Sequence, residues 1–135
     1  MTENRNNIPY YAECGAILDA CREVNRSMGT GFTEPVYQEC LALELNFRGI
    51  PFTREPSICI HYKGHELEKL LRPDFICFNK IIVELKAVER LLGEHKAQLL
   101  NYLFATGYEL GLLVNLGRND ITFERVPNFK TLKHT

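Results

Sequence analysis

The chain has 135 residues, of which 45% are hydrophobic, and a formal net charge of −1 at pH 7. This length and composition predict one globular domain over residues 1–135, and the near-neutral charge argues against a strongly basic nucleic-acid binder, so any such binding needs a local basic patch. No apolar run approaches the roughly 18 residues of a membrane span, and residues 1–7 lack a signal-peptide apolar region, so we expect a cytoplasmic protein without membrane contact.

The N-terminal third of the sequence predicts two helices. Apolar residues recur at helical spacing from Cys14 to Met28, and a Gly-Thr-Gly segment at 29–31 ends this run. A second helix opens after Thr33, which is a suitable cap, with Pro35 in its first turn. The predicted apolar stripe of this second helix consists of Val36, Cys40, Leu43 and Phe47.

The middle of the chain predicts strands. Residues 58–62 alternate between apolar and polar types up to a turn at Gly64, and a second strand leads towards Asp74. The apolar runs 75–78 and 81–83 flank Asn79, whose turn chemistry predicts a tight hairpin.

The C-terminal third predicts a helix between strands. The helix carries Leu99, Leu100, Leu103 and Phe104 and ends at Gly107, a buried strand follows over 111–116, and Ile121 and Phe123 mark a short last strand. Residues 1–8 and 128–135 are expected to be frayed. From the second helix onward the order is αβββαβ, which predicts an α/β fold with a mixed central sheet flanked by helices, plus an extra N-terminal helix and a short C-terminal strand.

Five cysteines, an odd number with no C-x-x-C pair, fall mostly within apolar patterns. We expect them to be reduced core residues: Cys14, Cys21, Cys40, Cys59 and Cys77.

Two carboxylates on the predicted hairpin are the most informative residues. Asp74 and Glu84 each lie five residues from Asn79, so a turn centred there places them opposite each other, with Cβ atoms roughly 5 Å apart. Opposed carboxylates flanked by apolar residues repel each other unless a proton or a cation relieves them. Oxygen ligands of this kind suit Mg²⁺ or Mn²⁺. Lys86 returns to the same face as Glu84, within reach of an ion-bound water, although Glu84 and Lys86 could instead form an ion pair at a strand end.

The order of elements, together with Pro73-Asp74 and Glu84-Leu85-Lys86, resembles the core of the PD-(D/E)XK nuclease superfamily. Within it the chain resembles the GxxExxY family, whose name is spelled by the residues Gly-Phe-Thr-Glu-Pro-Val-Tyr at 31–37. The resemblance continues through the segments 72–74, 84–88, 98–103 and 111–117. It implies a restriction-endonuclease-like fold and a metal-dependent nuclease.

The resemblance also implies roles for individual residues. Asp74, Glu84 and Lys86 would be catalytic, with Asp74, Glu84 and the Leu85 backbone carbonyl binding the metal. Lys86 would act as the base for the attacking water or as an electrostatic partner. Glu34 would approach the metal directly or through water, whereas the alternative is an acid that complements the dipole of the second helix.

Four further residues are supporting or substrate-positioning candidates. Gln98 and Tyr102 resemble the QxxxY motif of RecB-like and phage exonuclease relatives, in which these residues help to position the metal site and the strand; alternatively, they are the polar edge of an amphipathic helix. Tyr37 shares a face with Glu34 and either bonds to it or packs in the core, and we favour packing. Arg72 either contacts phosphate or solvates the surface.

These observations predict hydrolysis of phosphodiester bonds in nucleic acid, with DNA ahead of RNA, by water that Mg²⁺ or Mn²⁺ activates. A chain this small would need a homodimer or another partner for sequence-specific cleavage. Two alternatives stay open. One is a nuclease-fold nucleic-acid-binding or assembly module with little catalysis, and the other is a hydrolase of a small phosphorylated molecule, which a deep closed pocket would favour.

Overall fold

The structure is a computed structural model that describes residues 8–132. The expected fraying of residues 1–7 and 133–135 falls outside the described residues. For Ile8 and Asn128, which the structure describes, the expectation of fraying is wrong. Ile8 packs against the main core, and Asn128 is buried, with its side-chain amide donating to the carbonyls of Leu103 (3.1 Å) and Tyr108 (2.8 Å).

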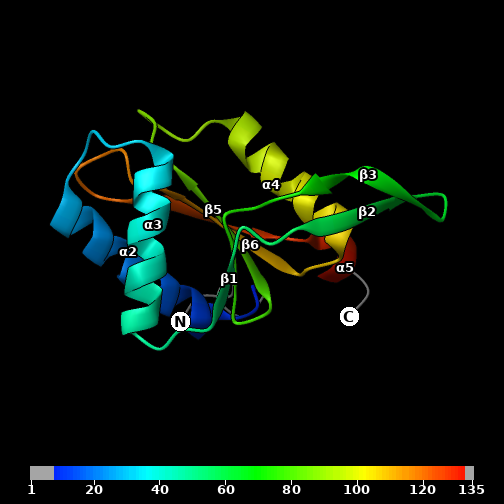
Figure 1. Cartoon of the computed structure of the whole chain (residues 1–135), viewed down its shortest axis with the longest axis horizontal. Coiled ribbons are helices and arrows are strands. Elements are labelled where there is room, and N and C mark those ends of the chain that lie inside the picture. The colour runs from blue at the N-terminus through cyan, green and yellow to red at the C-terminus, as the bar shows by residue number, and fades with distance from the viewer. Residues whose placement is uncertain (1–7, 133–135) are drawn as a thin grey trace.

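A five-stranded mixed sheet forms the centre of the fold. Its strands, in the spatial order β1-β4-β5-β6-β7, are β1 (Phe52–Arg54), β4 (Phe75–Cys77), β5 (Ile81–Lys86), β6 (Leu110–Asn115) and β7 (Thr122–Pro127). Strands β5 and β6 are parallel, and the other neighbours are antiparallel. Helices flank this sheet, which confirms the predicted mixed α/β fold (Figure 1).

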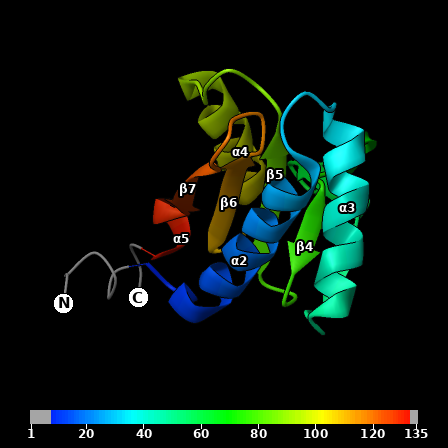
Figure 2. The ribbon, with the colours of Figure 1, turned by 90° about the vertical axis from the view of Figure 1, so that its left-hand side faces the viewer.

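Two layers of side chains cover the two faces of the sheet. Helices α2 (Tyr11–Met28) and α3 (Glu34–Phe47) lie on one face, and α4 (Gly93–Thr106) lies on the other (Figure 2). Because side chains alternate along a strand, Val83 of β5 packs in the α2 and α3 layer, and Ile82 packs in the α4 layer. Glu84 lies two residues after Ile82 on β5, so its side chain is on the face of the sheet that α4 covers.

The predicted second helix exists, but it buries a different face. Thr33 precedes α3 in an extended conformation without a side-chain cap hydrogen bond. In the predicted stripe, Leu43 is 52% exposed and Phe47 is 77% exposed. Apolar side chains occur on two neighbouring faces of this helix, and its packing against α2 and the sheet selects the face with Tyr37, Gln38, Leu41, Ala42 and Leu45.

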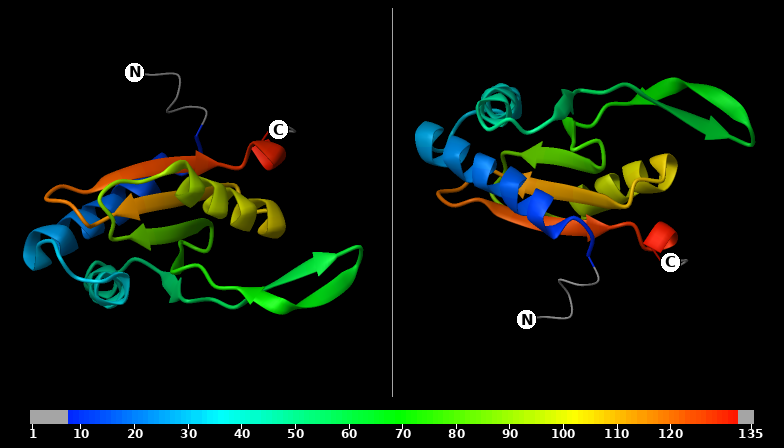
Figure 3. Two further views of the ribbon diagram at one scale, coloured as in Figure 1. Left: turned by 90° about the horizontal axis from the view of Figure 1, so that it is seen from above. Right: turned by 90° about the horizontal axis from the view of Figure 1, so that it is seen from below.

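The strand that opens the αβββαβ core is β1, which the sequence pattern did not predict. The predicted strand over 58–62 is β2 (Ile58–Tyr62), and it pairs with β3 (His65–Leu71) in a separate two-stranded hairpin inserted between β1 and β4. This hairpin projects from the body of the molecule (Figure 3). A three-residue strand such as β1 is too short to show an alternating pattern.

The C-terminal third follows the prediction more closely. Helix α4 ends at Gly107, which has a φ of 80°, and β6 is buried throughout. Strand β7 is longer than expected, and a short helix α5 (Phe129–Leu132) follows it. Among the described helices, none is long and apolar enough to cross a membrane.

The five cysteines are free thiols, and their burial varies. Cys14, Cys21 and Cys77 are buried in the core as predicted, and Cys40 is partly buried. The prediction is wrong for Cys59, which is exposed on the projecting hairpin.

Candidate metal site

The turn between β4 and β5 sets the register that brings the two carboxylates together. Phe78 and Asn79 both adopt left-handed φ angles, 55° and 60°, and the turn closes where Lys80 N–H donates to the carbonyl of Cys77 (3.1 Å). Phe75 pairs with Val83 across the two strands. One more step of the same register places Asp74 opposite Glu84, in agreement with the prediction.

Backbone N–H groups fix both carboxylates against the neighbouring strand. The N–H of Asp74 donates to Oε1 of Glu84 (2.7 Å), and the N–H of Leu85 donates to Oδ2 of Asp74 (2.7 Å). Glu84 is only 7% exposed. These reciprocal hydrogen bonds hold the two acids at the point where β4 begins and β5 approaches its end.

Burial makes the negative charge of this pair unfavourable. Burial raises the pKa of Asp74 and Glu84, and the charge of Asp74 raises the pKa of Glu84 further. Glu34 raises both pKa values through its charge, and the ammonium group of Lys86 lowers them. Without a cation, the pair therefore retains protons at a higher pH than ordinary carboxyl groups do.

Gln38 is a member of the site that sequence reasoning missed. Its Nε2 donates to Oδ1 of Asp74 (2.7 Å), while its Oε1 accepts from Nε of Arg54 (2.8 Å). Gln38 is buried on α3, one helical turn after Glu34. The i,i+4 spacing of these two polar residues was the signal available in the sequence.

Glu34 brings the start of α3 to the end of β5. Its Oε2 accepts from the N–H of Ala87 at 3.3 Å. Glu34 also lies in the first turn of α3, as the helix-dipole alternative requires. The structure therefore places Glu34 beside the strand that carries Glu84 and Lys86.

Asn115 fixes the chain where it leaves β5. Its Oδ1 accepts from the N–H groups of Val88 (3.0 Å) and Gly117 (3.0 Å), and its Nδ2 donates to the carbonyl of Val88 (2.9 Å). A Cβ atom on Gly117 would lie 2.6 Å from the Val88 carbonyl oxygen, so this position requires glycine. The side chain of Asn115 therefore fastens the segment that follows Lys86 to the end of β6.

Lys86 is partly buried on the same face of β5 as Glu84. In residues 8–132 it forms no ion pair, so the alternative of a simple Glu84–Lys86 ion pair at the strand end is not observed. Its charge nevertheless acts on both carboxylates.

The predicted supporting residues occupy different environments. Tyr102 is partly buried on α4, and burial together with the charges of Glu84 and Asp74 raises its pKa, whereas Gln98 and Arg72 are exposed. Tyr37 packs in the core as favoured, and its hydroxyl donates to the carbonyl of Gly29 (2.6 Å). Tyr37 thereby fastens the loop that precedes α3.

The donor set of Asp74 and Glu84 fits a hard divalent cation. Both are oxygen donors, Glu84 is buried and Asp74 is partly buried, and no ion pair within the described residues neutralises them. In the same part of the chain, no three His, Cys, Asp or Glu side chains converge on one point. A cation bound here would therefore need a backbone carbonyl and water to complete its coordination.

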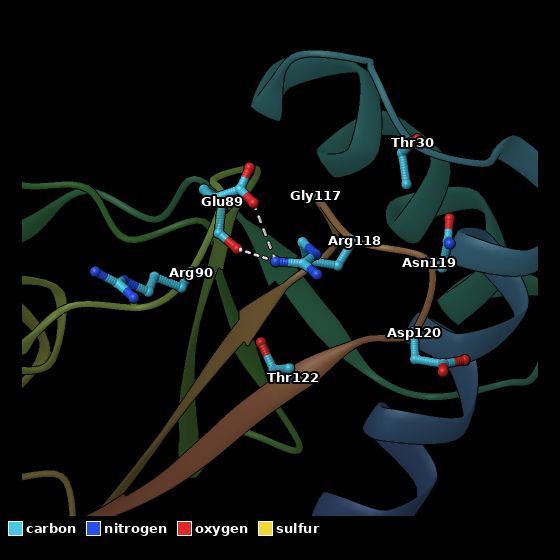
Figure 4. Close-up of a pocket in the computed structure, with 8 residues that line it drawn as sticks. All are labelled: Thr30, Glu89, Arg90, Gly117, Arg118, Asn119, Asp120 and Thr122. Atoms are coloured by element: carbon cyan, nitrogen blue, oxygen red, sulfur yellow. Dashed lines mark hydrogen bonds and ion pairs between the residues drawn. The ribbon is translucent and has the colours of Figure 1, made fainter.

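A cavity of about 580 Å³ lies beside the ends of β5 and β6, and its lining residues do not include Asp74, Glu84 or Lys86 (Figure 4). Arg118 crosses it and donates from Nη1 to the carbonyl oxygen (3.1 Å) and Oε1 (3.2 Å) of Glu89. Because the carboxylates lie outside this cavity, it gives no support to a small-molecule hydrolase.

Comparison with known proteins matches residues 11–126 to a family model described as the PD-(D/E)XK nuclease superfamily. Among solved structures, the protein SSO0001 is 22% identical with a TM-score of 0.54, over 73% of this chain and 54% of that one. An alkaline exonuclease from Laribacter hongkongensis is 12% identical with a TM-score of 0.52, over 96% of this chain and 77% of that one. The chain thus spans about half the length of SSO0001. No curated protein matches it.

Proposed function

The chain belongs to the PD-(D/E)XK nuclease superfamily, and from this premise we propose that it is a metal-dependent nuclease that hydrolyses phosphodiester bonds in DNA or RNA, with DNA as the favoured substrate. The observation that carries the proposal is the pair of reciprocal backbone hydrogen bonds that holds Asp74 against Glu84 and Leu85. We also propose that the chain belongs to the GxxExxY family, and the contact of Glu34 of that motif with the end of β5 supports this proposal.

We propose that Asp74 and Glu84 bind Mg²⁺ or Mn²⁺ together with the backbone carbonyl of Leu85, and that Glu34 contributes directly or through water. A bound divalent cation supplies a lower pKa for a coordinated water and compensates charge on the scissile phosphate. The raised pKa values of the two buried carboxylates support this assignment, because a cation would relieve the same repulsion that protons relieve in its absence.

The side chain of Lys86 would act on the attacking water. As a base, its neutral amine would take a proton from that water. As an electrostatic partner, its ammonium group would stabilise negative charge that develops on the phosphate. Both roles need a lysine that no neighbouring acid holds in an ion pair. Lys86 forms no ion pair within the described residues.

The surrounding residues would keep the acids in position. Gln38 orients Asp74 by a direct hydrogen bond, and Asn115 fixes the backbone that follows Lys86. Gln98, Tyr102 and Arg72 would contact the nucleic-acid strand. Tyr102 is the best supported of these three, since the charges of both carboxylates influence it.

A cleavage assay tests the proposal. Circular single-stranded DNA, linear duplex DNA and RNA are incubated with Mg²⁺ or Mn²⁺, with EDTA as the control for metal dependence. Asp74→Ala and Lys86→Ala should abolish cleavage. Asp19→Ala and Lys96→Ala are matched surface controls that should retain it, because both residues form exposed ion pairs outside the site. Binding without any cleavage would instead favour the binding-module alternative.

A further inference from the structure

The β2–β3 hairpin has a regular tip and a supported base. Tyr62 pairs with His65 across a turn at Lys63 and Gly64, whose positive φ angles of 50° and 82° suit a two-residue hairpin turn. At its base, Ile58 packs with the cluster of side chains around α4. Residues 61–70 are all exposed, and the hairpin extends beyond the sheet (Figures 1 and 3).

The two faces of this hairpin differ in chemistry. One face of the hairpin carries the residue pairs Ile58–Leu71 and Tyr62–His65. We name it the inner face, because Ile58 on this face packs against the cluster around α4. The register shifts between Cys59 and His61, so residues 67–69 have no paired residue on β2. Alternation counted from His65 and from Leu71 nevertheless agrees, and it gives an inner face of Ile58, Ile60, Tyr62, His65, Leu67, Lys69 and Leu71. The opposite, outer face consists of Cys59, His61, Glu66, Glu68 and Leu70, and a contact between Cys59 Sγ and Glu66 Oε2 (3.6 Å) joins its two strands.

The inner face therefore combines an aromatic ring, aliphatic side chains and basic groups without a carboxylate. Tyr62 is 61% exposed and Leu67 is 38% exposed. The ammonium group of Lys63 lies 5.4 Å from the centre of the Tyr62 ring, so a cation accompanies the aromatic surface. Aromatic side chains interleaved with basic groups are typical of surfaces that bind single-stranded nucleic acid, in which bases stack and phosphates meet cations.

The distribution of unpaired cations favours the same surface. Within residues 8–132, six basic residues form ion pairs with acids: Arg22, Arg26, Arg48, Lys80, Lys96 and Arg118. Between residues 60 and 90, by contrast, most basic residues have no carboxylate partner in the described structure, namely Lys63, Lys69, Arg72, Lys86 and Arg90. On the hairpin, Glu66 and Glu68 of the outer face balance Lys63 and Lys69 in charge, so its positive charge is confined to the inner face and the turn.

The hairpin leads directly to the candidate metal site. Strand β3 ends at Leu71, and Asp74 follows three residues later. The inner face and α4, which carries Tyr102, lie on the same side of the structure. A strand of nucleic acid along the inner face would therefore arrive at Asp74 and Glu84.

We infer that the inner face of the β2–β3 hairpin binds single-stranded DNA or RNA and directs it to the carboxylate pair. Only unpaired bases can stack on Tyr62 and contact the aliphatic side chains, because the bases of a duplex are stacked on one another. The inference rests on the proposed nuclease function and names its substrate class.

Binding measurements with matched variants test this inference. Fluorescein-labelled oligothymidylate, oligouridylate and a duplex are titrated with protein in EDTA, and fluorescence anisotropy is followed. The inner-face variant Tyr62→Ala/Lys69→Ala should bind both single strands about tenfold more weakly or worse. The outer-face variant Glu66→Ala/Glu68→Ala also removes two exposed side chains and should bind as tightly as the wild type, or more tightly.

Cleavage kinetics separate this inference from the proposed function. On single-stranded substrate, the inner-face variant should raise KM about tenfold and leave kcat nearly unchanged. Asp74→Ala should abolish turnover and retain anisotropy binding. Absence of cleavage by the wild type would contradict the proposed function and leave the binding result valid.

Three results would overturn the inference itself. The first is equal single-strand binding by the inner-face and outer-face variants. The second is duplex binding as tight as single-strand binding. The third is a wild-type dimer in sedimentation that the inner-face variant dissociates, because a second copy of the chain would then cover this face.

Discussion

Two antiparallel hairpins follow one another in this chain and place their side chains in opposite environments. The β4–β5 hairpin lies between two layers of helices, where burial raises the pKa of Asp74 and Glu84 and backbone N–H groups fix their positions. The β2–β3 hairpin is exposed from residue 61 to residue 70. The comparison teaches that burial in the β4–β5 hairpin raises the pKa of the two carboxyl groups that we propose as metal ligands. Exposure leaves the β2–β3 hairpin with a surface that can contact a substrate.

The largest effect should come from removing one buried carboxylate. Asp74→Asn keeps the shape of the side chain and removes its charge, so metal-dependent cleavage should fall at least about a thousandfold in kcat. The measurement is single-turnover cleavage with saturating metal. Wild-type activity in this variant would show that the buried hairpin does not carry the chemistry.

Two isoleucine-to-alanine substitutions, one in each hairpin, compare how much each hairpin contributes to the free energy of unfolding. Ile82 is fully buried on β5, and Ile82→Ala should lower the free energy of unfolding by about 2–5 kcal/mol. Ile60 lies on the projecting hairpin, and Ile60→Ala should lower it by less than about 1 kcal/mol. Urea denaturation measures both values, and equal losses would contradict the described difference in burial.

Gln38 should influence activity through the buried pair. Gln38→Ala removes the hydrogen bond to Asp74 Oδ1, so metal affinity or cleavage should fall by about 10- to 100-fold. The neighbouring Glu39→Ala is the control, because Glu39 is exposed on the same helix. If raising the metal concentration restores the activity of Gln38→Ala, the lost hydrogen bond acts through metal binding.

The smallest effect is the change in the free energy of unfolding with pH. The folded-state pKa of Glu84 is raised by burial and then by Asp74, so the folded protein binds more protons than the unfolded chain above the ordinary carboxyl pKa. In EDTA, the free energy of unfolding should therefore fall as pH rises through the folded-state pKa.

Glu84→Gln removes this titration. It should stabilise the metal-free protein by about 1–2 kcal/mol at pH 8 and have little effect at pH 4. Thermal melts at the two pH values, with the exposed Glu89→Gln as control, measure the difference. A loss of stability at pH 8 in Glu84→Gln would contradict the sign of the shift.

The buried hairpin was predictable because its turn lies midway between two apolar runs. The symmetry about Asn79 paired Asp74 with Glu84, and the observed register of β4 and β5 agrees with it. The α/β order was predictable for a similar reason, since the long helices and the buried strand β6 give strong periodic signals.

Other features depend on tertiary packing that the sequence does not specify. Gln38 lies among apolar residues of α3, and only the approach of Asp74 from another element gives it a role. The buried face of α3 is selected by its neighbours, because two of its faces are apolar. The alternation of residues 58–62 indicates a strand but not which element covers it, so the exposure of Cys59 and Tyr62 was not predictable from it.

Calorimetric titration of Mn²⁺ into the wild type, Asp74→Asn and the surface control Asp19→Asn tests the central claim most directly. We predict one binding event in the wild type and in Asp19→Asn, and its loss in Asp74→Asn. Undiminished Mn²⁺ binding by Asp74→Asn would contradict the assignment of the buried carboxylate pair as the metal site.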